Sequence, residues 1–356
     1  MGESSKLVCV IAAGGTAGHV RPALAIAEAL RARGVAVTFA GSPDRVESRL
    51  VPEAGYQLDT FEISGIPRRP GLAFCRALVR AAAAPFACLR ILARRRPGIV
   101  LGAGGYVAGP MVLAAWLRRT PAVLTESDAR LGLANRLAAP FARTVFLAYD
   151  LEDRRSAKYR VVGRPIPVAH LGASREEGRT RFDLPADRPV VAVFGALAGA
   201  RSLNELALSA WGASGPAVLH ICGERDYHPL GERELRSDYV LLPQTEHFGE
   251  ALAAADLAVS RAGSTVWELA AAGTPAILVP YPYATGDHQL LNARHFERGG
   301  GAIVVADAEL ARVPALVDEL LADPGRLARM RAAMLALARP HAADDIAEEM
   351  IALARV

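Results

Sequence analysis

Hydrophobic positions in this chain form short β-branched runs that alternate with longer segments rich in alanine and leucine. The runs 7–13 (LVCVIAA), 35–41 (VAVTFAG) and 189–200 (PVVAVFGALAGA) are largely apolar, which is typical of buried strands. The segment 22–34 (PALAIAEALRARG) has apolar residues at helical spacing and ends at Gly34. This alternation of strand and helix predicts an α/β fold with parallel sheets.

Two such series of similar length follow each other, and each opens with a strand and a glycine loop. Gly163 and two prolines interrupt the pattern around 162–167, which predicts a domain boundary there. We therefore expect two Rossmann-like domains, the first over 1–162 and the second over 163–341. The amphipathic segment 342–356 predicts a short helix that packs back on the first domain.

Composition narrows the functional classes. The chain has 41 Lys and Arg against 37 Asp and Glu, and its net charge of +4 is too small to indicate nucleic-acid binding. The four cysteines are scattered without metal-ligand spacing, so we expect a reduced, cytoplasmic setting and no metal site. The run 7–13 is too short for a signal peptide. The uncharged stretch 99–117 is long enough for a membrane span, but its glycines and Pro110 predict strand, loop and helix.

Three glycine loops follow predicted strands: 14–19 (GGTAGH), 102–106 (GAGGY) and 195–201 (GALAGAR). Glycine lets the backbone approach a ligand closely, and exposed N–H groups suit a phosphate or diphosphate. The first loop matches neither the dinucleotide GxGxxG nor the GxxxxGK[ST] pattern, and alone it could be a tight turn. Three loops from both halves predict a shared phosphate-binding cleft.

His19 lies at a loop–helix junction after a strand, where an imidazole is placed for general-base catalysis; the alternative is a structural turn histidine. In 260–268 (SRAGSTVWE), Ser264 or Thr265 is expected to cap a helix, and Glu268 to accept two ribose hydroxyls. The alternative there is an ordinary cap with a first-turn glutamate. The polar segment 286–292 offers sugar contacts or is a surface turn.

Between Gly71 and Arg96, apolar residues alternate with arginines. At helical spacing Arg76, Arg80, Arg90 and Arg94 form a stripe roughly 80° wide. A basic stripe beside apolar side chains suits an acidic membrane surface, whereas the alternative is a core-facing helix with a solvated basic face. Pro85 is expected to kink or split this helix.

Taken together, these motifs resemble the MurG family. The resemblance spans nearly the whole chain, and the matching segments are 14–30, 63–65, 101–110, 132–138, 161–165, 199–205, 260–273 and 287–293. It implies a GT-B fold, two Rossmann-like domains facing an interdomain cleft. It also implies inverting transfer of N-acetylglucosamine from UDP-N-acetylglucosamine to lipid I, a polyprenyl-diphosphate-linked muramyl peptide, which forms lipid II for peptidoglycan. The implied enzyme needs no cofactor and works as a peripheral protein on the cytoplasmic face of the plasma membrane.

The resemblance also implies roles for individual residues. The catalytic positions are His19, as base or acceptor-positioning group, and Glu126. The donor-binding positions are Thr16, Ala17, Gly18, Asp128, Gly199, Arg261, Gly263, Ser264, Thr265, Glu268 and Gln289. The acceptor-side positions are Tyr106, Asn135 and Asn204.

The chain departs from the family pattern at four places, one of which is the block between Gly263 and Glu268, one residue shorter than usual. The usual HEQN reads TESD at 125–128, so that Asp128 replaces an asparagine. The usual GGSQGA reads GALAGA, with Leu197 in place of the serine that binds diphosphate, and the usual NPVR reads RPIP, ending at Pro167. Arg164 or Arg201 would restore positive charge near the diphosphate. Three alternatives remain open: a glycosyltransferase for a soluble natural-product acceptor, a nucleotide-sugar epimerase, and a sugar-nucleotide-binding protein without catalysis.

Overall fold

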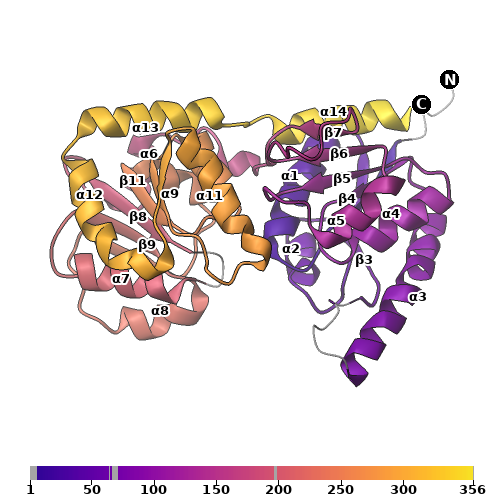
Figure 1. The fold of residues 1–356 in the computed structure, drawn as a ribbon, viewed down its shortest axis with the longest axis horizontal. Helices are drawn as coiled ribbons and strands as arrows, with labels where there is room; N and C mark the ends of the chain where they lie inside the picture. Colours follow the sequence, from indigo (N-terminus) through magenta and orange to yellow (C-terminus); the bar gives the residue numbers. More distant parts are fainter. Residues whose placement is uncertain (1–5, 64, 66–70, 196–198, 356) are drawn as a thin grey trace. The chain divides into compact units, whose positions relative to one another are not determined.

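The computed structural model describes residues 6–63, 65, 71–195 and 199–355 (Figure 1). Its backbone contacts divide the chain into two compact units, Met1–Pro167 with His341–Val356, and Val168–Pro340. Each unit contains one sheet whose strand pairs are all parallel, with helices in the connections between strands. The predicted α/β class with two Rossmann-like parallel sheets is confirmed.

In the first unit the strand order is β3-β2-β1-β4-β5-β6-β7. The central strands are buried between helix layers, so their residues are apolar on both faces, as in the wholly buried IVLG of β4. The edge strands β3 and β7 are partly exposed and carry polar residues. The strands are β1 (Val8–Ala12), β2 (Ala36–Gly41), β3 (Gln57–Thr60), β4 (Ile99–Gly102), β5 (Ala122–Glu126), β6 (Thr144–Leu147) and β7 (Tyr159–Val161). The helices are α1 (Ala17–Ala32), α2 (Glu47–Glu53), α3 (Leu72–Arg95), α4 (Ala108–Leu117), α5 (Leu133–Ala138), the 3₁₀ turn η1 (Ala139–Phe141) and α14 (Ala342–Ala354).

In the second unit the strand order is β10-β9-β8-β11-β12-β13. The strands are β8 (Val190–Phe194), β9 (Ala217–Ile221), β10 (Tyr239–Leu242), β11 (Leu257–Ser260), β12 (Ala276–Leu278) and β13 (Ala302–Val304). The helices are α6 (Arg175–Arg181), α7 (Arg201–Trp211), α8 (Glu224–Gly231), α9 (Phe248–Ala254), α10 (Val266–Ala272), α11 (His288–Arg298), α12 (Val313–Leu321) and α13 (Pro324–Leu337). Three 3₁₀ segments complete the unit, η2 (Val168–His170), η3 (Thr285–Asp287) and η4 (Asp307–Arg312).

In each sheet, successive strands are added first on one side of the first strand and then on its other side. This reversal lies between β1 and β4 in the first sheet and between β8 and β11 in the second. Ligands of open α/β sheets bind outside the carboxyl ends of the strands at such switch points. Three of the four loops that leave these strands are the glycine loops 14–19, 102–106 and 195–201, and the fourth begins the 260–268 segment. The topology therefore places every predicted glycine loop at a switch point.

The last helix, α14, belongs to the first unit. Its Ile346 and Met350 are fully buried in the same core cluster as β1 and α1. Arg33, which follows α1, forms ion pairs with Asp344 at 2.7 Å and Glu348 at 2.8 Å. These contacts tie the end of the chain to the first sheet.

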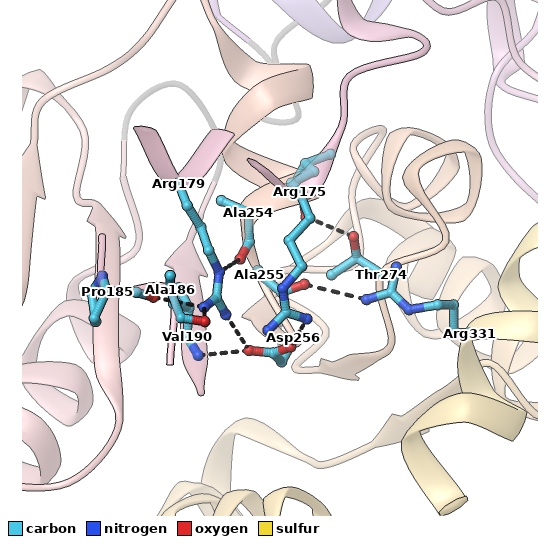
Figure 2. Close-up of polar contacts among 11 residues, drawn as sticks. Arg175, Arg179, Pro185, Ala186, Val190, Ala254, Ala255, Asp256, Thr274 and Arg331 are labelled. Carbon is cyan, nitrogen blue, oxygen red and sulfur yellow. Dashed lines mark hydrogen bonds and ion pairs between the residues drawn. The ribbon is translucent and has the colours of Figure 1, made fainter. Parts of the chain in front are cut away.

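At the amino ends of β8 and β11, one arginine joins several loops (Figure 2). The buried Arg179 of α6 donates to the carbonyls of Pro185 at 2.6 Å and Ala186 at 2.8 Å, and to Oδ2 of Asp256 at 2.8 Å. The same carboxylate oxygen accepts the backbone N–H of Val190 at 2.8 Å. Burial lowers the pKa of Arg179. This cluster holds the amino ends of β8 and β11 together, at the opposite strand ends from the switch point.

Candidate functional site

The first glycine loop is built on a buried carboxylate that the sequence analysis missed. Glu47, the first residue of α2, is 0% exposed. Its Oε2 accepts the backbone N–H of Gly15 at 2.9 Å, and its Oε1 accepts that of Ser42 at 3.0 Å. A side chain on Gly14 would collide with this carboxylate. A glutamate in the first turn of a helix is too common a feature to have indicated this role.

The first two glycine loops touch each other. Gly104 has φ +92°, and a Cβ there would lie 2.6 Å from Cδ2 of His19. Gly105 has φ +73°, and a Cβ there would collide with the carbonyl oxygen of Gly14. Any larger residue would therefore be strained and would push the loops apart. The carboxyl ends of β1 and β4 thus form one continuous glycine surface.

His19 is held across this surface. Its Nδ1 lies 3.2 Å from the carbonyl oxygen of Gly14 and 3.2 Å from Oγ1 of Thr16. Because a carbonyl oxygen only accepts, the Gly14 contact requires a proton on Nδ1, which places the basic lone pair of the neutral ring on Nε2. Buried Arg164 donates to the carbonyl of Gly18 in the first turn of α1, which places a positive charge beside the loop.

Tyr106 ends the second glycine loop and is 55% exposed. A Cβ on Gly65 would lie 2.6 Å from both Cζ and the hydroxyl of Tyr106, so the tyrosine ring covers this glycine, the last residue of the matching segment 63–65. Tyr106 directly follows Gly105 of the glycine surface and is more than half exposed as a residue.

Glu126 uses both of its carboxylate oxygens for hydrogen bonds within the first unit. Its Oε1 accepts the backbone N–H groups of Ser127 at 3.0 Å and Asp128 at 3.2 Å, and its Oε2 accepts the N–H of Gly132 at 2.8 Å. Oε2 also accepts Nδ2 of Asn135 at 2.9 Å. Burial raises the pKa of Glu126, and these donors oppose that rise. Glu126 therefore holds the loop after β5, and its predicted catalytic role stays a prediction.

Asn135 is a partner of this carboxylate rather than an exposed ligand group. It is 4% exposed, and its Nδ2 also donates to the carbonyl of Thr125 at 2.9 Å. Its amide nitrogen is thus used inside the unit, and its predicted acceptor-side role stays a prediction. Asp128, half-buried, follows in the loop that Glu126 organises.

In the second unit, the third glycine loop packs on the end of β9. Gly199 has φ +79°, and a Cβ there would collide with the carbonyl of Cys222. Asn204, on α7, is 1% exposed and donates to the same carbonyl at 2.9 Å and to Oδ2 of Asp226 at 3.0 Å. Its Oδ1 lies 3.0 Å from Nε2 of buried His220. Asn204 therefore anchors the end of β9 on which Gly199 packs, and its predicted acceptor-side role stays a prediction. Leu197 lies outside the described residues.

Arg261 is also an internal anchor. It is 7% exposed, and its guanidinium donates to the carbonyls of Val279 at 3.2 Å and Pro280 at 3.3 Å. It also donates to Oγ of Ser202 at 2.7 Å and pairs with Asp307 at 2.6 Å. These bonds hold the loop after β12 and the start of α7 together. Arg261 therefore supports the loops around the predicted donor-binding positions, and its predicted contact with the donor stays a prediction.

The segment after β11 leads into α10. Space around Gly263 is open, since a Cβ there would meet no atom within 4 Å. Thr265 is the N-cap residue of α10 but its side chain makes no capping hydrogen bond, so the predicted cap is corrected for this residue. The half-buried Ser264 and Thr265 side chains lie at the open turn beside Gly263.

Glu268 has a partner that the sequence analysis did not find. Its Oε1 lies 2.6 Å from Nδ1 of His170, and both side chains are about one tenth exposed. Gln289, on α11, accepts the backbone N–H of Tyr281 through Oε1 at 2.9 Å. The amide nitrogen of Gln289 takes no part in that contact. Among the residues described here, no group of three His, Cys, Asp or Glu side chains is arranged to hold a metal ion.

A separate candidate surface lies on α3, whose first half extends beyond the rest of its unit (Figure 1). Of the two effects expected of Pro85, the split is wrong, because the helix continues through it, and the kink stays a prediction. Leu92 is fully buried, whereas Leu72, Val79 and Phe86 are 81%, 69% and 67% exposed. In the described part of the chain, no helix combines the length and apolar character needed to cross a bilayer.

Two arginines of the predicted basic stripe are already paired within the unit. Arg80 forms an ion pair with Glu62 at 3.2 Å, and Arg94 pairs with Asp59 at 2.6 Å. The neighbouring Arg95 bonds the same Asp59 at 2.7 Å. The pKa of Asp59 is lowered: burial opposes this shift, and the two arginines outweigh it.

Comparison with known proteins covers both units. Residues 9–147 match the glycosyltransferase family 28 N-terminal domain, and residues 190–350 match its C-terminal domain. The chain is similar to UDP-N-acetylglucosamine–N-acetylmuramyl-(pentapeptide) pyrophosphoryl-undecaprenol N-acetylglucosamine transferases. It is 36% identical to that of Halothermothrix orenii, covering 95% of this chain and 96% of the relative, and 42% identical to that of Halorhodospira halophila, with the same two coverages.

Among solved structures, the crystal structure of Acinetobacter baumannii MurG is 28% identical with a TM-score of 0.77. The alignment covers 98% of this chain and 99% of that one. Because the two domain models match most of both units and the relatives align over nearly the whole chain, this protein belongs to glycosyltransferase family 28 and, within it, to the MurG family.

Proposed function

We propose that this chain is an inverting glycosyltransferase that moves N-acetylglucosamine from UDP-N-acetylglucosamine to the muramyl sugar of lipid I, forming lipid II. The observation that carries the proposal is the interlocked pair of glycine loops with His19 held across them. The donor and the acceptor are those in the names of the relatives.

His19 acts as the general base. The acceptor hydroxyl forms its bond to the anomeric carbon while the bond from that carbon to UDP breaks, and Nε2 of His19 takes the hydroxyl proton. A single displacement of this kind inverts the configuration at the carbon. The bond from Nδ1 to the Gly14 carbonyl holds the ring in the required tautomer.

The leaving UDP carries negative charge, which exposed backbone N–H groups and the amino end of α1 stabilise. Thr16, Ala17 and Gly18 form this end of the helix, with Arg164 beside it. Glu268 accepts ribose hydroxyls, and the amide nitrogen of Gln289 is available to the transferred sugar. We expect transfer without a metal or other cofactor, so activity should persist in EDTA.

The test is UDP release from UDP-N-acetylglucosamine with and without a lipid I analogue. We expect release only with the acceptor, and a loss of about 10²- to 10⁴-fold in His19→Ala with UDP binding kept. His228→Ala, which changes an exposed histidine on α8, is the matched control. Donor consumption without acceptor would indicate an epimerase, and parent-like transfer by His19→Ala would refute the assigned base.

We further propose that α3 contacts the acidic cytoplasmic face of the plasma membrane, where the polyprenyl acceptor resides. The exposed positions recur at alternating spacings of four and three, which places them on one helical face. They are Leu72, Arg76, Val79, Ala83, Phe86 and Arg90. Apolar side chains of such a stripe enter the lipid interface, and its arginines attract acidic headgroups.

Co-sedimentation with vesicles tests this surface. We expect the parent chain to bind vesicles that contain phosphatidylglycerol more strongly than vesicles of phosphatidylcholine alone, and Phe86→Asp to weaken that binding. Leu335→Asp, at a half-exposed leucine of the second unit, should bind like the parent. Binding that ignored both the acidic lipid and Phe86→Asp would exclude α3 as the contact.

A further inference from the structure

His170 and Glu268 lie far apart in the chain but share one short hydrogen bond. His170 is the last residue of η2, and Glu268 lies in the first turn of α10. The separation of Nδ1 and Oε1 is 2.6 Å, which is typical of a strong bond to an ionised partner. Because a carboxylate only accepts, Nδ1 of His170 carries the proton that is shared with Glu268.

The histidine itself is held firmly. Its ring packs against Phe248 of α9, with ring centroids 5.8 Å apart. A Cβ on the neighbouring Gly249 would lie 2.6 Å from Cα of His170, so η2 is seated closely on α9. The imidazole therefore presents Nδ1 at a defined point rather than sampling several rotamers.

This contact uses only one of the two carboxylate oxygens of Glu268. Oε1 accepts from His170, whereas no other hydrogen bond to this carboxylate occurs among the described residues. A glutamate side chain has three rotatable bonds, and a single strong bond to one oxygen restricts where the other oxygen points. Oε2 is the atom left for a pair of neighbouring hydroxyls.

We infer that His170 is a positioning residue that fixes the Glu268 carboxylate for the ribose hydroxyls of the donor nucleotide. This inference rests on the proposed function, since it assumes that Glu268 receives the ribose. The imidazole does not contact the nucleotide; it determines the orientation of the group that does. Its removal should weaken nucleotide binding without changing the chemical step.

The experiment measures UDP binding by calorimetry and donor kinetics for the full-length parent, His170→Ala and His170→Gln. We expect His170→Ala to raise the Kd for UDP and the KM for UDP-N-acetylglucosamine about tenfold, the effect of losing one hydrogen bond to a charged group, with kcat within about twofold of the parent. His170→Gln keeps an N–H donor in reach of Glu268, so it should recover part of the loss. The control is His228→Ala, on the exposed face of α8.

A second nucleotide distinguishes positioning from general damage to the unit. UDP that lacks both ribose hydroxyls (2′,3′-dideoxy-UDP) removes the groups that Glu268 is inferred to bind. The parent should bind it more weakly than UDP, and His170→Ala should bind it as well as the parent does. Should His170→Ala weaken both nucleotides equally, or neither, the inference is overturned.

The same data separate this inference from the proposed function. A parent chain that binds no UDP overturns the proposed function and the inference with it. A parent chain that binds UDP and transfers sugar, but whose ribose preference His170 does not affect, overturns only the role of His170. If His170→Ala does not fold, His170→Gln carries the test: a reduced preference for UDP over the dideoxy nucleotide supports the role, and a preference equal to that of the parent contradicts it.

Discussion

Acidification should destabilise the second unit through one buried histidine. His220, on β9, is 0% exposed, and burial lowers its pKa from 6.5 to about 4. Its Nε2 donates to Oδ1 of Asn204 and its Nδ1 accepts the hydroxyl of Tyr239 at 2.8 Å, so the folded state holds the neutral ring. Between pH 6.5 and 4 the unfolded chain binds a proton that the folded chain refuses. Stability from this site is therefore intact above pH 6.5 and falls as the pH is lowered.

The magnitude follows from the two pKa values. Integrating the difference in proton binding from neutral pH down to pH 4.5 gives a loss of about 2.5 kcal/mol, at about 1.36 kcal/mol for each pH unit of separation. Loss of the bonded ring would loosen Asn204, which supports Gly199 through the carbonyl of Cys222. Acid should thus affect the third glycine loop before the rest of the unit.

Urea unfolding at a series of pH values measures this effect. Many carboxylates titrate over the same range, so the informative quantity is the difference in unfolding free energy between the parent and His220→Gln. This difference should fall by about 2.5 kcal/mol from pH 7.5 to pH 4.5 because glutamine does not titrate. His228→Gln, at an exposed histidine, should leave the pH dependence of the parent unchanged. A parent-minus-His220→Gln difference that does not vary with pH would refute the reasoning.

Two further substitutions test the supports of the switch points. Glu47→Gln leaves one carbonyl oxygen for two backbone N–H donors. Urea unfolding should therefore show a loss of roughly 1–3 kcal/mol in the free energy of unfolding, and sugar transfer should slow. The control Glu53→Gln, at the exposed end of α2, should change neither the stability nor the transfer rate. Asp256→Asn breaks a buried ion pair with Arg179 and should reduce the free energy of unfolding by roughly 3–5 kcal/mol. The folded fraction should keep the parent kcat, because this cluster lies at the amino ends of the strands and the candidate site at their carboxyl ends. Parent-like stability in either variant would contradict its assigned role.

The sheets and the glycine loops were predictable because their signals are local. A strand buried on both faces must be apolar along its length, and a backbone that approaches another backbone must be glycine, as at Gly104, Gly105 and Gly199. Helix α3 was predictable in extent but not in continuity, since Pro85 is accommodated within it. Local pattern therefore determined what the segments are.

The partners of the site were not predictable because they come from distant positions. Glu47 meets Gly15 across 32 residues, and His170 meets Glu268 across 98. Glu126 shows a second limit. Its match to the family pattern indicated that this carboxylate matters, but it did not indicate that backbone N–H groups bind both of its oxygens. Residue type indicates what a side chain can bind, and only the folded neighbourhood decides what it does bind.

The contact between the first two glycine loops has a consequence for engineering. Because Gly105 packs directly on the carbonyl of Gly14, the conformations of segments 14–19 and 102–106 depend on each other although the segments are separated in the chain. Exchanging one of them for the corresponding loop of a relative with altered preferences should yield an inactive hybrid. A library that seeks new acceptors should transplant both segments together as one cassette.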